Sequence, residues 1–76
     1  MAQNPSRIEG RIHNAKRCTF DGRDCWIAAI HDAGTGAFVT SALNVQEVAS
    51  PKEGKLWLLQ RASAMGLPLA KISVTP

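Results

Sequence analysis

The stretch SPKEGKLWLLQRASAMGLP, residues 50–68, decides the fold of this chain because it contains the signals for both ends of a helix. Ser50 is a preferred residue just before a helix, where its hydroxyl accepts a bond from a backbone amide of the first turn. Pro51 suits the first helical position. Glu53 completes a capping box, in which its carboxylate bonds back to the Ser50 amide.

The end of the same stretch is equally well marked. Gly66 suits the left-handed conformation that follows many helices, and Leu67 supplies the apolar residue that often packs back on the last turn. Pro68 cannot continue a helix. The sequence therefore predicts a helix over residues 51–65.

At 100° per residue, one stripe of this helix is apolar and is expected to face the core. The stripe comprises Leu58, Leu59, Ala62 and Met65. Leu56 lies almost opposite the stripe, and Trp57 lies at its edge next to Arg61. Either the helix is buried on two sides, or Leu56, Trp57 and Arg61 contact a partner.

Strand-like segments rich in β-branched and aromatic residues surround this helix. The predicted strands are residues 12–20, 25–31, 37–45 and 69–75. Asp21-Gly22 is a strong hairpin signal between the first two strands, and residues 33–36 predict a second turn. The expected fold is α+β with the order β-β-β-α-β. It consists of a three-stranded antiparallel meander, a helix and a fourth strand that runs parallel to the third.

Length and composition indicate one small domain. The chain has 76 residues, of which 45% are hydrophobic and 20% charged, with a net charge of +3. These values exclude intrinsic disorder, and no apolar run is long enough to span a bilayer. The N-terminal residues lack a signal-peptide core, so a cytoplasmic protein is expected.

Residues 1–11 are expected to be a polar tail, with the domain in residues 12–76. Ile8-Glu9-Gly10-Arg11 matches the recognition sequence of a clotting protease that is used in expression linkers. A vector origin and a natural tetrapeptide both remain open.

Candidate chemical sites are weak. A two-residue Asp21-Gly22 loop would place Cys18 opposite Cys25, either as a redox pair or as two buried apolar residues. Together with His13 and His31, the two thiols could supply four metal ligands. Their spacing lacks the paired Cys or His units of metal sites, so no metal is expected. No nucleophile or phosphate-binding motif is present, which predicts a protein without catalytic residues, cofactor or small-molecule substrate.

A basic and aromatic group offers a possible nucleic-acid surface. Lys16, Arg17 and Arg23 flank the first hairpin, and Trp26 lies in the second strand. If Arg17 and Trp26 share a face, they suit phosphates and unstacked bases. Alternatively, Trp26 belongs to the core face and the cations are only solvated.

Two segments resemble a known family. IHDAGTGAFV, residues 30–39, resembles the turn between the second and third strands of RNase H-like domains of the plant and retroelement type. Residues 49–66 and 72–74 resemble the helix and fourth strand that follow there. The resemblance implies an RNase H-like fold over residues 26–76.

The residues that such an enzyme needs are incomplete here. The family carries metal-binding acids in its first strand, in its helix and at the end of its fourth strand. This chain offers Asn14 in the first strand and Glu53 in the helix, and its last residue is Pro76. The resemblance therefore implies an inactive relative that cannot assemble a two-metal site. WIAAI, residues 26–30, is also similar to the middle strand of sheet-based DNA binders.

The sequence thus favours a non-enzymatic module that binds protein, either as a small inhibitor or by self-association, through Leu56, Trp57 and Arg61. The alternative is nucleic-acid binding through Lys16, Arg17, Arg23 and Trp26. Counterion release separates the two hypotheses, because only nucleic-acid binding should weaken steeply with salt.

Overall fold

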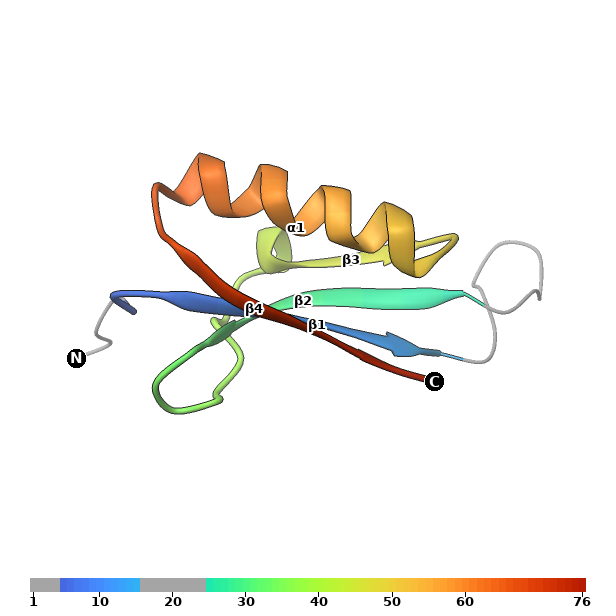
Figure 1. Ribbon diagram of the computed structural model, residues 1–76, viewed down its shortest axis with the longest axis horizontal. Helices are drawn as coiled ribbons and strands as arrows, with labels where there is room; N and C mark the ends of the chain where they lie inside the picture. Colours follow the sequence, from blue (N-terminus) through green and yellow to red (C-terminus); the bar gives the residue numbers. More distant parts are fainter. Residues whose placement is uncertain (1–4, 16–24) are drawn as a thin grey trace.

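The computed structural model describes residues 5–15 and 25–76 of the chain. Its elements, in order, are β1 (Ile8–Asn14), β2 (Trp26–Asp32), a short 3-10 helix η1 (Ala42–Asn44), β3 (Val45–Val48), α1 (Pro51–Met65) and β4 (Leu69–Thr75). They form two layers, with α1 on one face of a single sheet (Figure 1).

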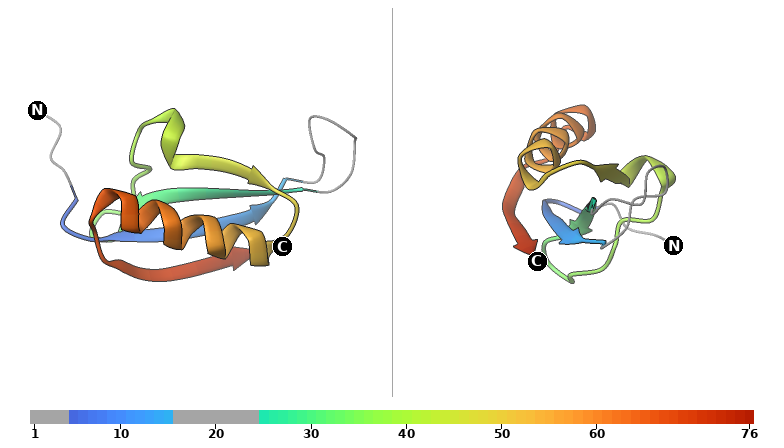
Figure 2. Two further views of the ribbon diagram at one scale, coloured as in Figure 1. Left: turned by 90° about the horizontal axis from the view of Figure 1, so that it is seen from above. Right: turned by 90° about the vertical axis from the view of Figure 1, so that its right-hand side faces the viewer.

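The sheet has four strands in the order β3-β2-β1-β4. Strand β2 is antiparallel to both of its neighbours, whereas β4 is parallel to β1. The α+β class is confirmed, but the predicted three-stranded meander is wrong because the sheet is mixed. The predicted pairing of the third and fourth strands is also wrong. Because β2 leaves one side of β1 unpaired, the chain returns through α1 to that side, and β3 and β4 become the two edges (Figure 2).

The first strand begins earlier than predicted. Residues 8–11, assigned by the sequence to a polar tail, form the first half of β1. Ile8 is fully buried there, and Gly10 lies directly below Leu58 of the helix. The tetrapeptide is therefore part of the sheet whatever its origin, and β1 begins four residues before the predicted strand at residue 12.

The register of β1 and β2 revises the expected cysteine pairing. Asn14 is the last residue of β1 and pairs with Trp26. Next to this pair, the Ala15 amide donates to the Cys25 carbonyl at 2.8 Å. Cys25 is buried opposite Ala15, while Cys18 and the Asp21-Gly22 turn lie outside the described residues.

The third strand lies later than predicted, at residues 45–48 rather than 37–45. Local hydrogen bonds of polar side chains explain the shift. The Ser41 hydroxyl accepts from the Leu43 amide and caps η1, and Asn44 donates to the Val39 carbonyl at 2.9 Å. Such side-chain bonds compete with strand pairing. Of the predicted strand, Phe38 makes an isolated bridge to His31.

The helix bounds are confirmed. The Ser50 hydroxyl accepts from the Glu53 amide at 3.3 Å, and the Glu53 carboxylate accepts from the Ala49 amide rather than from that of Ser50. Gly66 adopts φ 69°, and the Leu67 amide donates to the Ala62 carbonyl as in a Schellman motif. The helix therefore begins and ends where local bonds replace its missing backbone partners.

The core lies between α1 and the helix-facing side of the sheet. Its buried members are Ile8, Ile12, Ala28, Ile30, Leu58 and Ala62. Trp26, Trp57 and Met65 pack around them. The prediction that Leu59 faces the core is wrong, because Leu58 points at Gly10 and Leu59, one residue later, is turned by about 100°.

Candidate interaction surface

Two leucines of α1 point away from the core. Leu56 and Leu59 are each 55% exposed, although both belong to the helix that covers the sheet. They are three residues apart and so are neighbours on the helix surface. Single exposed apolar residues are ordinary, but an adjacent pair with a further apolar neighbour forms a patch.

Leu59 lies on the side of α1 that faces β4. Arg61 donates from Nε to Asn44 Oδ1 at 3.0 Å, and Asn44 directly precedes β3. Leu59 is two residues before Arg61, so the two side chains diverge by about 160°. Since β3 and β4 are opposite edges of the sheet, the side of the helix away from Asn44 is the β4 side.

Val74 is a further exposed apolar residue on β4. It is 41% exposed and pairs with Ile12, whose side chain is buried under α1. Paired residues point to the same face of a sheet, so Val74 also points to the helix side. We call these three side chains, Leu56, Leu59 and Val74, the β4-side surface.

The outer edge of β4 accompanies this surface. Within residues 5–15 and 25–76, β4 pairs only with β1, so its other side presents main-chain amide and carbonyl groups. Pro68 and Pro76 flank the seven-residue strand, and its register with β1 shifts between Ile8 and Gly10. Lysine, proline and a bulge are features by which native edges discourage unselective pairing, so a strand added beside Lys71 needs a complementary charge.

Three lysines surround the β4-side surface. Lys52 and Lys55 precede Leu59 by seven and four residues, which places all three on one side of the helix. Lys71 is on β4 itself and is exposed at its side chain to 68%. Neither Lys52 nor Lys55 forms an ion pair within the described part of the chain.

The described acidic side chains are Glu9, Asp32, Glu47 and Glu53. Glu9 is buried on β1, where its Oε2 lies 3.6 Å from Lys71 Nζ, and Asp32 accepts bonds from the turn that follows β2. Glu53 caps the helix about 120° away from Leu59 but only three residues before Leu56. The β4-side surface is therefore apolar, with three lysines around it and Glu53 at its Leu56 end.

The three residues predicted to bind protein do not share one surface. Leu56 is exposed, as expected for a residue opposite the core stripe. Trp57 is half-buried and packs against the core. Arg61 is held by Asn44 on the β3 side of the helix. The sequence did not predict that Leu59 and Val74 are exposed. The three-residue spacing of Leu56 and Leu59 was the available signal, because it makes them neighbours on the helix surface.

The residues predicted to bind nucleic acid are described only in part. Lys16, Arg17 and Arg23 lie outside the described residues. Trp26 is on the helix-facing side of β2 and packs against the core, so the interpretation of Trp26 as a core residue is confirmed. Its ring is partly covered and offers less area for stacking than an exposed platform would.

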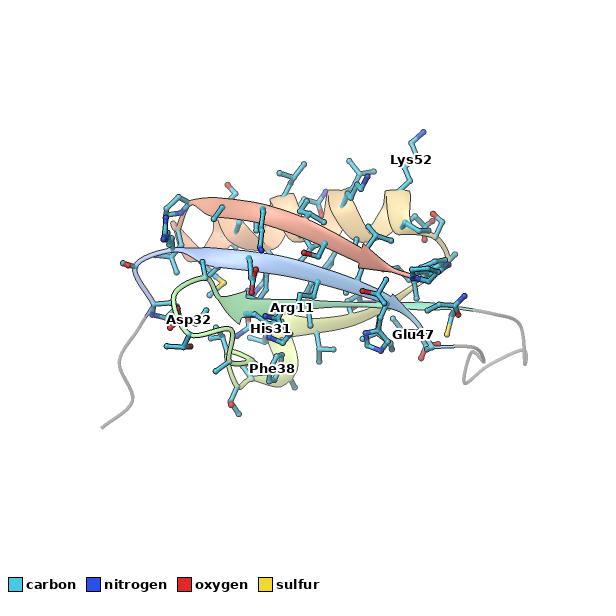
Figure 3. The ribbon with its side chains drawn as sticks, turned by 60° about the horizontal axis from the view of Figure 1, so that its bottom comes forward. Arg11, His31, Asp32, Phe38, Glu47 and Lys52 are labelled. Atoms are coloured by element: carbon cyan, nitrogen blue, oxygen red, sulfur yellow. The ribbon has the colours of Figure 1, made fainter. Side chains whose placement is uncertain are left out.

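The face of the sheet opposite α1 carries an ion-pair cluster (Figure 3). Arg11 donates from Nη2 to Glu9 Oε1 at 2.7 Å, and Lys71 Nζ lies 3.6 Å from Glu9 Oε2. The bond from Arg11 holds the pKa of the buried Glu9 carboxyl below its usual value. Nearby, His31 bonds to the Gly36 carbonyl and contacts the ring of Phe38. These groups satisfy one another, so the cluster is structural.

Metal-ligand geometry is not found in the described ranges, where no three His, Cys, Asp or Glu side chains converge. His31 is occupied by Gly36, and Cys25 is buried. Asn14 ends β1, and the Glu53 carboxylate is bonded to the Ala49 amide. An open hollow of about 280 Å³, lined by Pro5, Val39, Met65 and Leu67, has no charged group.

No helix within residues 5–15 and 25–76 has both the length and the apolar character needed to cross a membrane. Comparison with known proteins identifies no relationship, because no family model, curated protein or solved structure matches the chain.

Proposed function

We propose that the chain is a non-enzymatic binding module, a small inhibitor or a dimerising protein, that contacts another protein through the β4-side surface. The observation that carries this proposal is the exposure of Leu56 and Leu59, each 55%, one turn apart on the helix. Full burial of an exposed leucine contributes about 1.5–3 kcal/mol, and each of these two is already about half buried, so covering the pair supplies roughly that amount in total. Val74 adds a further exposed apolar residue on β4.

The non-enzymatic part of the proposal draws support from Glu53. This residue matches the helical acid of the RNase H-like pattern, yet its carboxylate accepts the Ala49 amide in the helix cap. The proposed RNase H-like relationship therefore concerns the fold and not the reaction.

Site-specific photo-cross-linking in cells that express the chain tests the proposal. A photoreactive side chain at Leu56 or Leu59 should yield a discrete protein adduct, whereas the same group at exposed Thr40 should not. Excess wild-type chain should compete with the adduct, and the Leu56→Gln/Leu59→Gln double variant should not. The same adduct from Thr40, or no adduct from either leucine, would refute protein binding at this surface.

Nucleic-acid binding by Lys16, Arg17, Arg23 and Trp26 is the second candidate. Its support is the net charge of +3, while the core packing of Trp26 weakens it. A titration with single- and double-stranded oligonucleotides at two salt concentrations distinguishes it from protein binding. A contact with several phosphates should lose affinity steeply as salt rises. A contact dominated by Leu56 and Leu59 should change little.

A further inference from the structure

The outer edge of β4 is the part of the β4-side surface that defines what kind of partner fits. Its main-chain amide and carbonyl groups face away from β1 in a row, and only an extended backbone can pair with such a row. This inference rests on the proposed function, because the partner strand would lie against Leu59 and Val74.

The two faces of the sheet differ beside β4, which determines the partner's side-chain pattern. On the helix side, Val74 and Leu59 would contact every second side chain of an added strand. On the opposite side, the strand presents Lys71, Ser73 and Thr75. An added strand therefore needs apolar side chains toward the helix and polar side chains toward Lys71.

Charge selects among the polar side chains. Lys52, Lys55 and Lys71 surround the edge. Lys71 lies 3.6 Å from Glu9 on β1, but Glu9 also pairs with Arg11, so the two cations outnumber this one buried acid. Acidic groups in the partner would be attracted to this rim, and basic groups would be repelled. A second copy of the chain would bring its own three lysines toward these three, which disfavours it as the occupant.

We propose that the outer edge of β4 binds an extended partner segment in which apolar and acidic residues alternate. The segment adds a fifth strand to the sheet, with its apolar residues over Leu59 and Val74. Its acidic residues lie on the opposite face, beside Lys71.

Peptide titration of the full ¹⁵N-labelled chain tests the proposal. The probe is an end-blocked eight-residue peptide of alternating valine and glutamate. It should shift the amide signals of Leu69–Thr75 in a saturable manner and slow their hydrogen exchange. A valine–lysine peptide and a valine–glutamate peptide N-methylated at every second residue should bind at least about tenfold more weakly, because they lack the charge match or the backbone donors.

Two matched variants test the role of charge. Lys71→Ser should weaken binding about two- to fivefold, the range typical of an exposed ion pair. Lys52→Ser removes the same charge farther from the strand edge and should weaken binding less. Equal effects of both variants would show that binding follows net charge alone and would overturn the assigned position of the acidic residues.

The remaining outcomes separate this inference from the proposed function. Shifts confined to Leu56 and Leu59 would overturn strand addition while leaving protein binding by the helix intact. Amide signals of β4 that shift with protein concentration, without peptide, would identify a second copy of the chain as the occupant. That result would overturn the proposal of an acidic partner segment. If no peptide binds but the photo-cross-link forms, strand addition at β4 is refuted and protein binding by the β4-side surface stands. If the cross-link also fails to form, both are refuted.

Discussion

Gly10 is a residue at which the sheet and the helix approach closely. A Cβ at this position would lie 2.5 Å from Cδ1 and 2.9 Å from Cδ2 of Leu58. Leu58 is fully buried, so its methyl groups cannot move aside without displacing other core residues. The absence of a side chain at residue 10 therefore sets the height of α1 above β1.

We expect Gly10→Ala to destabilise the fold by about 1–3 kcal/mol through overpacking. Urea unfolding, followed by tryptophan fluorescence, measures the change. Gly34→Ala in the turn after β2 is the control, since its Cβ would meet only the Asp32 carboxylate, at 3.3 Å. An equal effect of both variants would show that the approach to Leu58 is not limiting.

Glu9 makes stability dependent on pH. Its folded pKa is lowered, chiefly by the hydrogen bond from Arg11, whereas the unfolded chain has the usual value of about 4.3. The stabilisation is therefore fully present above that value and is lost as pH falls through the folded pKa. Wild type should exceed Glu9→Gln in urea midpoint at pH 7, and the difference should shrink at pH 3. A difference that stays constant between these pH values would contradict this role.

At the scale of elements, α1 depends on its N-terminal cap. The Ser50 hydroxyl and the Glu53 carboxylate satisfy amides that lack intrahelical partners. Because the helix supplies Leu58 and Ala62 to the core, fraying of its first turn also exposes Gly54 and Ile12 below it.

Ser50→Ala should lower the free energy of unfolding by about 1 kcal/mol, since alanine cannot accept the Glu53 amide. Ser50→Asp is the conservative control, because aspartate caps a helix about as well as serine. Thermal or urea unfolding of the two variants measures the difference. Similar losses in both would mean that the cap hydroxyl is not what stabilises this end.

At the scale of the whole molecule, Asn44 connects three parts of the chain. It is buried, donates to the Val39 carbonyl and accepts from Arg61 of α1. The loop before β3 is thereby tied to the helix, which closes the β3 side of the core. The β4 side has no equivalent tie within the described residues, and that difference leaves Leu59 and Val74 exposed.

Asn44→Ala should cost about 2–3 kcal/mol, because it removes the bonds to both partners and leaves the Val39 carbonyl without its donor. Arg61→Ala removes only one of these bonds and should cost less. Chemical unfolding of both variants provides the comparison. Equal losses would indicate that the bond to Val39 contributes nothing.

The features that the sequence predicted correctly depend on residues close together in the chain. The helix limits follow from Ser50, Glu53 and Gly66, and the turn before Ala37 follows from Asp32 and Gly36. Each of these signals acts across a few residues, so it needs no knowledge of the rest of the molecule. The alternation of β4 is local in the same way, and its bounds were predicted correctly.

The features that the sequence did not determine all depend on contacts between distant segments. The pairing of β4 with β1 and the inclusion of residues 8–11 in the sheet depend on strand partners far away in the chain. The inward position of Leu58 rather than Leu59 depends on how α1 rests on Gly10. Periodicity places Leu58 and Leu59 on one broad stripe, and only packing against the sheet decides between them. The outward position of Leu59 is a consequence of that choice, because the helix turns Leu59 away from the core when it buries Leu58.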